Sequence, residues 1–170
     1  MNNVSSSESR YERQLHLSEI GEEGQRKIRK ARVLLVGVGG LGSPISLYLV
    51  GAGIGTLGLM DDDVVSVTNL HRQVLYDENQ IGLPKLHEAV ERLHRLNSEV
   101  KLEAYPYRLT RENAADIVAK YDMVIDGCDN FATRFLIDDA CREVGIPYIY
   151  GAVCGFDGQV AVFNVGSNAR

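Results

Sequence analysis

The feature that most constrains this chain is an apolar run that stops at a glycine-rich segment. Residues 31–37 read ARVLLVG, and nothing polar interrupts the run between Val33 and Val36. An unbroken run of this length is typical of a strand that is buried on both faces of a parallel sheet. The glycine-rich residues 37–42 read GVGGLG, and a helix is expected after them over residues 41–53. A G-x-G-x-x-G between a strand and a helix predicts a phosphate-binding turn.

Each glycine of this pattern has its own physical role. Gly37 permits the tight turn, Gly39 lets the backbone approach a phosphate, and Gly42 lets the helix pack on the strand. Asp61 follows Gly42 by 19 residues, at the end of the next expected strand, where its carboxylate can bind a ribose hydroxyl. Alone, these residues indicate the nucleotide domain of an NAD-dependent oxidoreductase. The alternative is a glycine-rich turn that binds nothing.

Strand and helix patterns alternate along the rest of the chain, which predicts an α/β fold with a Rossmann-like, doubly wound, mostly parallel sheet. We expect a disordered leader over residues 1–9, a helical N-terminal extension over 10–31 with one or two breaks near Gly21 and Gly24, and one nucleotide-binding domain over 32–170. The helix expected over 82–96 has an apolar stripe of Leu86, Val90, Leu93 and Leu96. Further helices are expected over 111–120 and 131–144, and further strands over 56–61, 100–105, 122–126, 146–151 and 158–164.

Composition excludes several classes of protein. The chain has 170 residues, and its 18 Lys and Arg against 23 Asp and Glu give a net charge of −5. An acidic chain argues against nonspecific nucleic-acid binding, which needs a basic surface. No apolar stretch is long enough to span a membrane, and the N-terminus lacks the apolar core of a signal peptide, so a cytoplasmic location is expected. Cys128, Cys141 and Cys154 form no CxxC pair, which signals neither a disulfide framework nor a local zinc site.

A second polar stretch follows Asp61 and carries cations. Asn69, Arg72 and Gln73 come shortly after the acidic triplet at 61–63, and Lys85 follows a dozen residues later. Arg presents a planar fork to phosphate oxygens, and Lys presents a point charge. Two cations beside a glycine loop suit a triphosphate better than the pyrophosphate bridge of a dinucleotide. The alternative is a solvated polar loop before a helix.

A third stretch, DGCDN at 126–130, ends the apolar strand expected over 122–126. It therefore lies at the carboxyl edge of a parallel sheet, where ligands bind. A carboxylate such as Asp129 can hold Mg²⁺ there, because this ion prefers oxygen ligands and bridges substrate phosphates. Alternatively, the polar residues only cap the following helix. For Cys128, an ordinary small core residue is expected rather than a reactive thiol.

A fourth motif, RYERQ at 10–14, stands before the nucleotide fold. Arg13 within it is either a functional cation or part of an exposed helix face. The four histidines at 16, 71, 87 and 94 show no spacing that indicates catalysis or metal binding, and no Ser-His-Asp or Cys-His pairing is apparent.

Together these pieces resemble the ThiF/MoeB/HesA family, the bacterial relatives of ubiquitin-activating enzymes. Six segments match in the family's order across nearly the whole chain. They are RYERQ (10–14), GVGGLG (37–42), DDDVVSVTNLHRQ (61–73), GLPK (82–85), DGCDN (126–130) and GAVCGFDGQVAVF (151–163). The resemblance implies a homodimeric adenylyltransferase that uses ATP and Mg²⁺. Such an enzyme activates the C-terminal glycine of a ubiquitin-like sulfur-carrier protein and releases pyrophosphate.

Carried over residue by residue, the resemblance implies Gly40 against the phosphates and Asp61 on the ribose. It implies Asp129 on Mg²⁺ with Asn130 beside it, and Arg13 in the site of the partner subunit. The remaining expected nucleotide contacts are Gly37, Gly39, Gly42 and Gln73, with Asn69, Arg72 and Lys85 around the triphosphate. The residues expected to act on the reacting groups are Arg13, Arg72, Lys85 and Asp129.

One departure from the family pattern leaves alternatives open. Family members continue past this point with two CxxC pairs that hold zinc and a region that docks the carrier tail. Zinc is therefore expected only if the parent protein carries those pairs. The alternatives are a relative of tRNA threonylcarbamoyladenosine dehydratases, a non-catalytic nucleotide-binding or dimerising fragment, and, less favoured, the oxidoreductase domain.

Overall fold

A computed structural model describes residues 10–166, and the leader expected over residues 1–9 lies outside them. Strands and helices alternate, as the sequence predicts. Their order is α2 (Glu12–Leu15), α3 (Gly21–Lys30), β1 (Arg32–Val36), α4 (Gly42–Ala52), β2 (Thr56–Met60), the short 3-10 helices η1 (Val67–Asn69) and η2 (Glu78–Gln80), α5 (Lys85–Leu96), β3 (Lys101–Tyr105), α6 (Ala114–Val118), β4 (Met123–Asp126), α7 (Phe131–Val144), β5 (Tyr148–Cys154) and β6 (Asp157–Phe163).

The strands form one six-stranded sheet in the order β3-β2-β1-β4-β5-β6. Neighbouring strands run parallel from β3 to β5, and β6 is antiparallel to β5. The chain adds β2 and β3 on one side of β1, and then β4 and β5 on the other. A doubly wound sheet binds ligands at such a reversal point, outside the carboxyl ends of the strands. The predicted fold class is confirmed, and the strand order places the expected site between β1 and β4.

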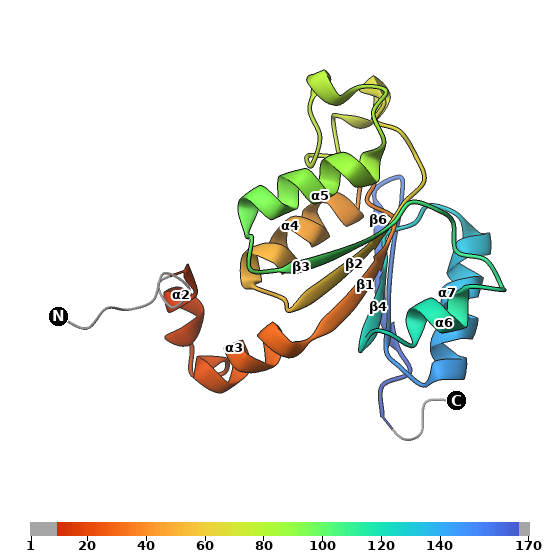
Figure 1. Ribbon diagram of the computed structural model, residues 1–170. Coiled ribbons are helices and arrows are strands. Elements are labelled where there is room, and N and C mark those ends of the chain that lie inside the picture. Colours follow the sequence, from red (N-terminus) through yellow and green to blue (C-terminus); the bar gives the residue numbers. More distant parts are fainter. Residues whose placement is uncertain (1–9, 167–170) are drawn as a thin grey trace.

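Helices cover both faces of the sheet, with α4 and α5 on one side and α6 and α7 on the other (Figure 1). The central strand β1 alternates between the two layers, because Val33 and Leu35 belong to one apolar cluster and Leu34 and Val36 to the other. All four side chains are at most 4% exposed. The unbroken apolar run of β1 therefore reflects burial on both faces. None of the helices described here is long and apolar enough to span a bilayer.

The N-terminal helical segment breaks once, directly before Gly21. The break lies over residues 16–20, and α3 then runs through Gly24 without interruption. A Cβ on Gly24 would lie 3.0 Å from Cγ2 of Ile20. The glycine thus lets Ile20 pack closely against the helix, and of the one or two predicted breaks only the one near Gly21 occurs.

Two further expectations were wrong in detail. The helix expected over 111–120 is only α6, because the Asn113 side chain accepts a hydrogen bond from the Thr110 N–H at 2.8 Å and holds a turn before it. In α5, Leu96 is 39% exposed, and Ala89 joins Leu86 and Leu93 on the buried face instead.

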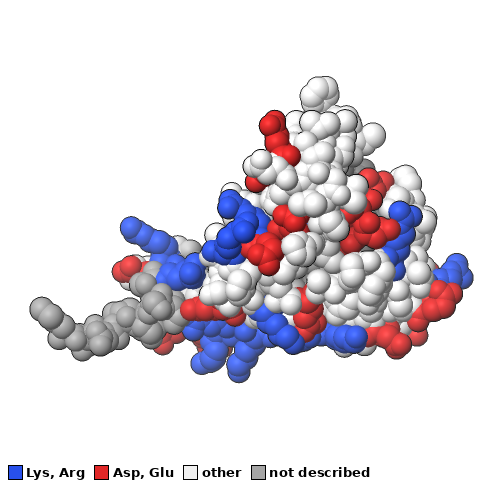
Figure 2. Space-filling model, turned by 45° about the horizontal axis from the view of Figure 1, so that its top comes forward, with Lys and Arg blue, Asp and Glu red and all other residues white. Residues whose placement is uncertain are grey.

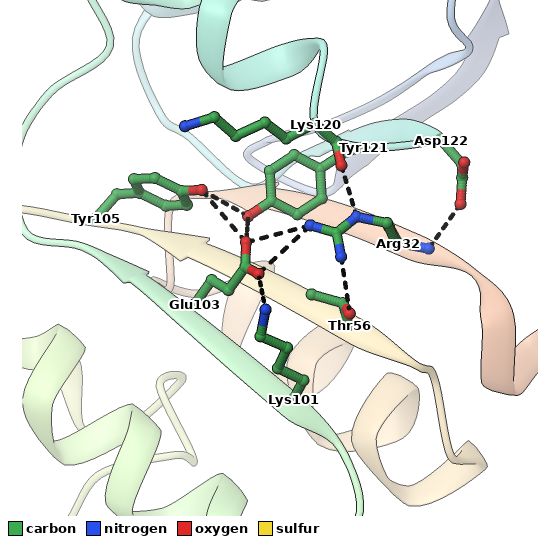
Figure 3. Close-up of polar contacts among 8 residues, drawn as sticks. All are labelled: Arg32, Thr56, Lys101, Glu103, Tyr105, Lys120, Tyr121 and Asp122. Carbon is green, nitrogen blue, oxygen red and sulfur yellow. Dashed lines mark hydrogen bonds and ion pairs between the residues drawn. The ribbon is translucent and has the colours of Figure 1, made fainter.

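A polar network joins the amino-terminal parts of β1 and β3 (Figure 3). The Glu103 carboxylate accepts hydrogen bonds from the Tyr121 hydroxyl at 2.8 Å and from Arg32 Nη2 at 3.4 Å, and it lies 2.7 Å from the Lys101 ammonium. Tyr121 covers Gly58 of β2, where a Cβ would lie 2.3 Å from the tyrosine oxygen. Because α6 ends at Val118, Tyr121 and its polar partners cover this part of the sheet.

These contacts lower the pKa of Glu103 from 4.5 to about 2, chiefly through Lys101 and then through Tyr121 and Arg32. Because the pKa is lower in the folded than in the unfolded protein, the ionised carboxylate stabilises the fold above about pH 4.5. We expect Glu103→Gln to lower the free energy of unfolding at pH 7 by about 1–2 kcal/mol, after discounting for solvent screening. The difference from wild type should shrink as the pH falls from 4.5 towards 2.

Urea unfolding over a pH series measures this difference. Glu91→Gln is the matched control, since it removes the charge of an exposed glutamate on α5. A Glu103→Gln difference that stays constant between pH 7 and pH 3 would show that the network stabilises the fold without the carboxylate charge.

Candidate functional site

The glycine segment connects β1 to α4 by unusually close backbone packing. Gly37 has a φ of +90°, a left-handed conformation that glycine adopts without strain. A Cβ on Gly42, the first residue of α4, would lie 2.0 Å from the carbonyl oxygen of Gly37. A Cβ on Gly127, just after β4, would lie 2.6 Å from the same oxygen. Gly37 and Gly42 are therefore needed for packing, and Gly127 is a third member that the sequence motif does not include.

The next two glycines face the polar segment that follows β2. A Cβ on Gly39 would lie 3.4 Å from Nε2 of Gln73, and a Cβ on Gly40 would lie 3.5 Å from Cδ of Arg72. The carbonyl of Asn69 accepts hydrogen bonds from the N–H groups of Arg72 and Gln73 at 3.1 and 3.0 Å. The structure thus brings the predicted residues Arg72 and Gln73 directly against the glycine segment, and Asn69 holds their backbone.

Arg72 and Gln73 differ sharply in their surroundings. Arg72 is exposed, and its Nη1 lies 3.2 Å from the carbonyl oxygen of Thr68 and 2.9 Å from Nε2 of His71. Gln73 is only 4% exposed, yet its Oε1 has no hydrogen-bond partner among the described residues. Buried amide oxygens are nearly always paired in folded proteins. An unpaired one beside a glycine loop fits a bound polar ligand.

Asp61, at the carboxyl end of β2, is oriented by backbone groups. Its Oδ2 accepts a hydrogen bond from the Val38 N–H at 2.9 Å, and its Oδ1 accepts one from the Asp63 N–H at 2.9 Å. The Tyr76 hydroxyl donates to the carbonyl of Val38 at 3.0 Å, so the backbone N–H and carbonyl of Val38 are both hydrogen-bonded. Burial raises the pKa of Asp61, and the two N–H groups and Lys85 oppose this effect. The carboxylate is fixed beside the loop.

Lys85, the first residue of α5, extends its side chain to the acidic residues that follow β2. Its side chain is 5% exposed, and its Nζ lies 3.0 Å from Oδ2 of Asp63. The Lys85 N–H also donates to the Asp63 carbonyl at 2.9 Å. A β-bridge between Val64 and Pro84 draws the two segments together. The structure therefore places Lys85 next to the acidic triplet, with Asp63 as a partner that the sequence did not single out.

The residues after β4 divide into two roles. Asn130 caps α7, since its Oδ1 accepts a hydrogen bond from the Thr133 N–H at 2.9 Å. The capping alternative is thus confirmed for Asn130. Asp129 is exposed, and its carboxylate makes no hydrogen bond or ion pair to another described residue. Burial, and then Asp126, raise the pKa of Cys128 to about 12, so this thiol is a poor nucleophile at neutral pH.

The side chains between residues 10 and 166 form no group of three or more His, Cys, Asp or Glu that could hold a metal by themselves. A lone carboxylate such as Asp129 fits Mg²⁺ in its commonest protein setting, where one or two carboxylates share the ion with substrate phosphates and water. The donors present therefore fit Mg²⁺ that arrives with a nucleotide, and not a protein-only metal site.

Arg13 lies away from these residues. It is exposed on α2, which is anchored by the neighbouring Tyr11, 1% exposed. The Tyr11 hydroxyl accepts a hydrogen bond from Asn97 Nδ2 at 2.7 Å, and its ring packs against Gly53. Gly53 follows the last turn of α4, whereas the glycine segment precedes the first turn. Because the eleven residues of α4 span about 16 Å, the anchor of α2 at Gly53 lies about that far from the glycine segment.

The charges of this site are mixed in sign. Arg72 and Lys85 lie near Asp61 and Asp63, and Asp129 faces solvent at the end of β4. Figure 2 shows acidic and basic side chains interspersed across the face that it presents. Such an arrangement can bind the phosphates of a nucleotide between a few fixed cations, with carboxylates for a ribose and a divalent cation.

The chain is similar in sequence to known adenylyltransferases. A sulfur carrier protein adenylyltransferase of Thermus thermophilus is 52% identical over 155 residues, which cover 91% of this chain and 57% of that protein. An adenylyltransferase and sulfurtransferase MOCS3 of Culex quinquefasciatus is 47% identical over 156 residues, 92% of this chain and 36% of that protein. The chain thus spans less than two thirds of the length of both relatives.

The crystal structure of the E. coli tRNA N6-threonylcarbamoyladenosine dehydratase TcdA in complex with ATP has a similar fold. It superposes with a TM-score of 0.79 at 30% identity, covering 85% of this chain and 60% of that one. The model of the ThiF family matches residues 11–170, nearly the whole sequence. This match extends over the glycine turn and the polar segment packed against it, and the chain belongs to the ThiF family.

Proposed function

We propose that residues 32–170 form the ATP-binding part of an adenylyltransferase that activates the C-terminal carboxylate of a small ubiquitin-like sulfur-carrier protein ending in Gly-Gly. The observation that carries this proposal is the contact of Gly39 and Gly40 with Gln73 and Arg72, with Asp61 and Lys85 beside them. It joins a phosphate-binding turn to cations and to a fixed carboxylate. The 52% identity to a sulfur carrier protein adenylyltransferase supports the same activity.

In the proposed reaction, an oxygen of the carrier carboxylate forms a bond to the α-phosphorus of ATP. The bond between that phosphorus and the bridging oxygen breaks, and pyrophosphate leaves with the electron pair. The attacking carboxylate is already ionised at pH 7, so the reaction needs no general base. It needs alignment and charge neutralisation, which fixed cations and dipoles provide.

The proposed role of each residue follows from its contacts. N–H groups of the glycine turn bind the phosphates, Asp61 accepts a hydrogen bond from a ribose hydroxyl, and the side-chain amides of Asn69 and Gln73 bind the nucleotide. Arg72 and Lys85 neutralise the β- and γ-phosphates. Asp129 would hold Mg²⁺, which when bound neutralises charge on the transferring and leaving phosphates.

The tRNA N6-threonylcarbamoyladenosine dehydratases remain the second candidate, because the TcdA structure shares the fold at 30% identity. The two candidates use the same nucleotide site and differ in the carboxylate that attacks. The higher identity to the sulfur carrier protein adenylyltransferase over nearly the same share of the chain favours the carrier protein as substrate.

We also propose a homodimer in which Arg13 completes the site of the partner subunit. An apolar hollow of about 700 Å³ on the outer face of α4 supports a second copy of the chain as its occupant. Tyr48 and Val74, which line it, are 81% and 62% exposed. Arg13 stands beside this face on α2, outside its own site. Closed twofold symmetry would give each of two sites one such arginine.

The first test concerns Lys85 and the β- and γ-phosphates. We expect Lys85→Ala to weaken binding of ATP with Mg²⁺ by about 1.5–3 kcal/mol, the value of a charge-assisted hydrogen bond, and to weaken AMP binding much less. Isothermal titration of the 170-residue chain with ATP and Mg²⁺, with AMP and with NAD measures this. Lys120→Ala is the matched control, since it removes an exposed lysine that lies before β4, at the amino-terminal ends of the strands. Equal weakening of ATP and AMP, or tighter binding of NAD than of ATP, would contradict the assignment.

The second test concerns Arg13 and the dimer. Arg13→Ala and Asp129→Asn subunits should each be inactive alone, but mixing them should restore activity to about one quarter of wild type, since half of the dimers are mixed and each has one intact site. The measurement is exchange of labelled pyrophosphate into ATP, in the shortest form of the protein that supports it. No recovery after demonstrated subunit exchange would place Arg13 outside the partner's site.

A further inference from the structure

We infer that Arg134 and Asp126 hold the turn that carries Asp129, so that Arg134 is a positioning residue for the Mg²⁺-dependent binding of ATP. This inference rests on the proposed function, because it matters only where Asp129 acts on a bound ion. Neither residue has an expected contact with the nucleotide.

Asp126 is wholly buried at the carboxyl end of β4. Its Oδ1 accepts a hydrogen bond from the Cys128 N–H at 2.9 Å. Its Oδ2 accepts one from the Tyr148 hydroxyl at 2.9 Å and lies 3.5 Å from Nε of Arg134. A buried carboxylate with a cation and two donors is strongly fixed, because each partner offsets the cost of its burial.

Arg134 projects from the first turns of α7 back to the same loop. Its Nη2 donates to the carbonyl of Cys128 at 3.0 Å and lies 3.5 Å from the carbonyl oxygen of Gly151. Its Nη1 donates to the Tyr150 hydroxyl at 3.2 Å. Together with Asp126, Arg134 therefore binds both backbone polar groups of Cys128, the residue that precedes Asp129.

The guanidinium has little freedom to move. Its side chain is 14% exposed, and its central carbon lies 5.1 Å from the ring centre of Tyr150 and 5.5 Å from that of Phe131. Arg presents several donors in one rigid plane, whereas Lys offers a single flexible ammonium. Arg134→Lys should thus keep a positive charge near Asp126 and lose the simultaneous contacts to the loop.

The direction of the Asp129 side chain depends on this backbone. Asp129 is exposed, and its carboxylate makes no hydrogen bond or ion pair to another described residue, so its backbone neighbours set its direction. On one side Cys128 is held by Asp126 and Arg134, and on the other Asn130 is held as the cap of α7. A shift of the Cys128 peptide would turn the carboxylate away from the phosphates that share its ion.

Two measurements on the 170-residue chain test the inference. The first is amide hydrogen exchange of the segment 126–130. Arg134→Lys and Arg134→Gln should speed the exchange of the Cys128 N–H, because the carboxylate that accepts it loses its neighbour. Arg142→Gln is the matched control, since Arg142 lies on the same helix and pairs with Asp138 on the surface. Unchanged exchange in a folded Arg134→Lys protein would overturn the inference.

The second measurement is a double-mutant cycle on nucleotide affinity. Arg134→Lys should weaken binding of ATP with Mg²⁺ by about tenfold, the loss that one charge-assisted hydrogen bond produces, and leave AMP without Mg²⁺ unchanged. In the Asp129→Asn background the same replacement should have no further effect. A full tenfold loss in that background, or an equal loss for AMP, would overturn the inference, since Arg134 would then act independently of Asp129. Failure of the wild-type chain to bind ATP with Mg²⁺ would contradict the proposed function instead, and hydrogen exchange would still decide whether Arg134 holds the turn.

Discussion

The carbonyl oxygen of Gly37 is the point on which the rest of this structure depends. Backbone from α4 and from the end of β4 approaches it so closely that a Cβ would lie 2.0 Å away at Gly42 and 2.6 Å away at Gly127. Three elements can meet there only because all three positions are glycines. Their contact fixes the start of α4 against the carboxyl edge of the sheet. A helix N-terminus held in this way favours negative charge in front of it.

The second determinant of the site is the segment between β2 and α5, which stands at the top of Figure 1 and folds back over the glycine turn. Asp63 connects its two ends, since its N–H binds the Asp61 carboxylate and its own carboxylate binds Lys85. The proposed ribose contact and the proposed phosphate contact are thereby linked through one residue. In the proposed complex, a phosphate of the nucleotide would replace Asp63 as the partner of Lys85.

Much of this was predictable from the sequence, and the parts that were not depend on contacts between distant segments. The run from Val33 to Val36 predicted a doubly buried strand, and the glycine spacing placed the turn after it, because both signals are local. Asp63 looked no different from its two acidic neighbours, and only the bridge between Val64 and Pro84 brings Lys85 to it. The burial of Gln73 and the reach of Arg134 depend in the same way on the folded chain. A second helix break was predicted at Gly24 because glycine often ends a helix, but this glycine lies inside α3 and allows close packing of Ile20. The cytoplasmic location, zinc in a longer parent protein and the identity of the carrier stay predictions.

The proposed adenylation is tested most directly by exchange of labelled pyrophosphate into ATP, which reports formation and reversal of the acyl-adenylate itself. With Mg²⁺ and a small protein ending in Gly-Gly, label should enter ATP only when that protein has a free C-terminal carboxylate. Asp129→Asn should abolish the exchange while weakening ATP binding less, because the charge held by Asp129 matters most as pyrophosphate departs. Exchange that proceeds without any carboxylate substrate, or that is near normal in Asp129→Asn, would contradict the account.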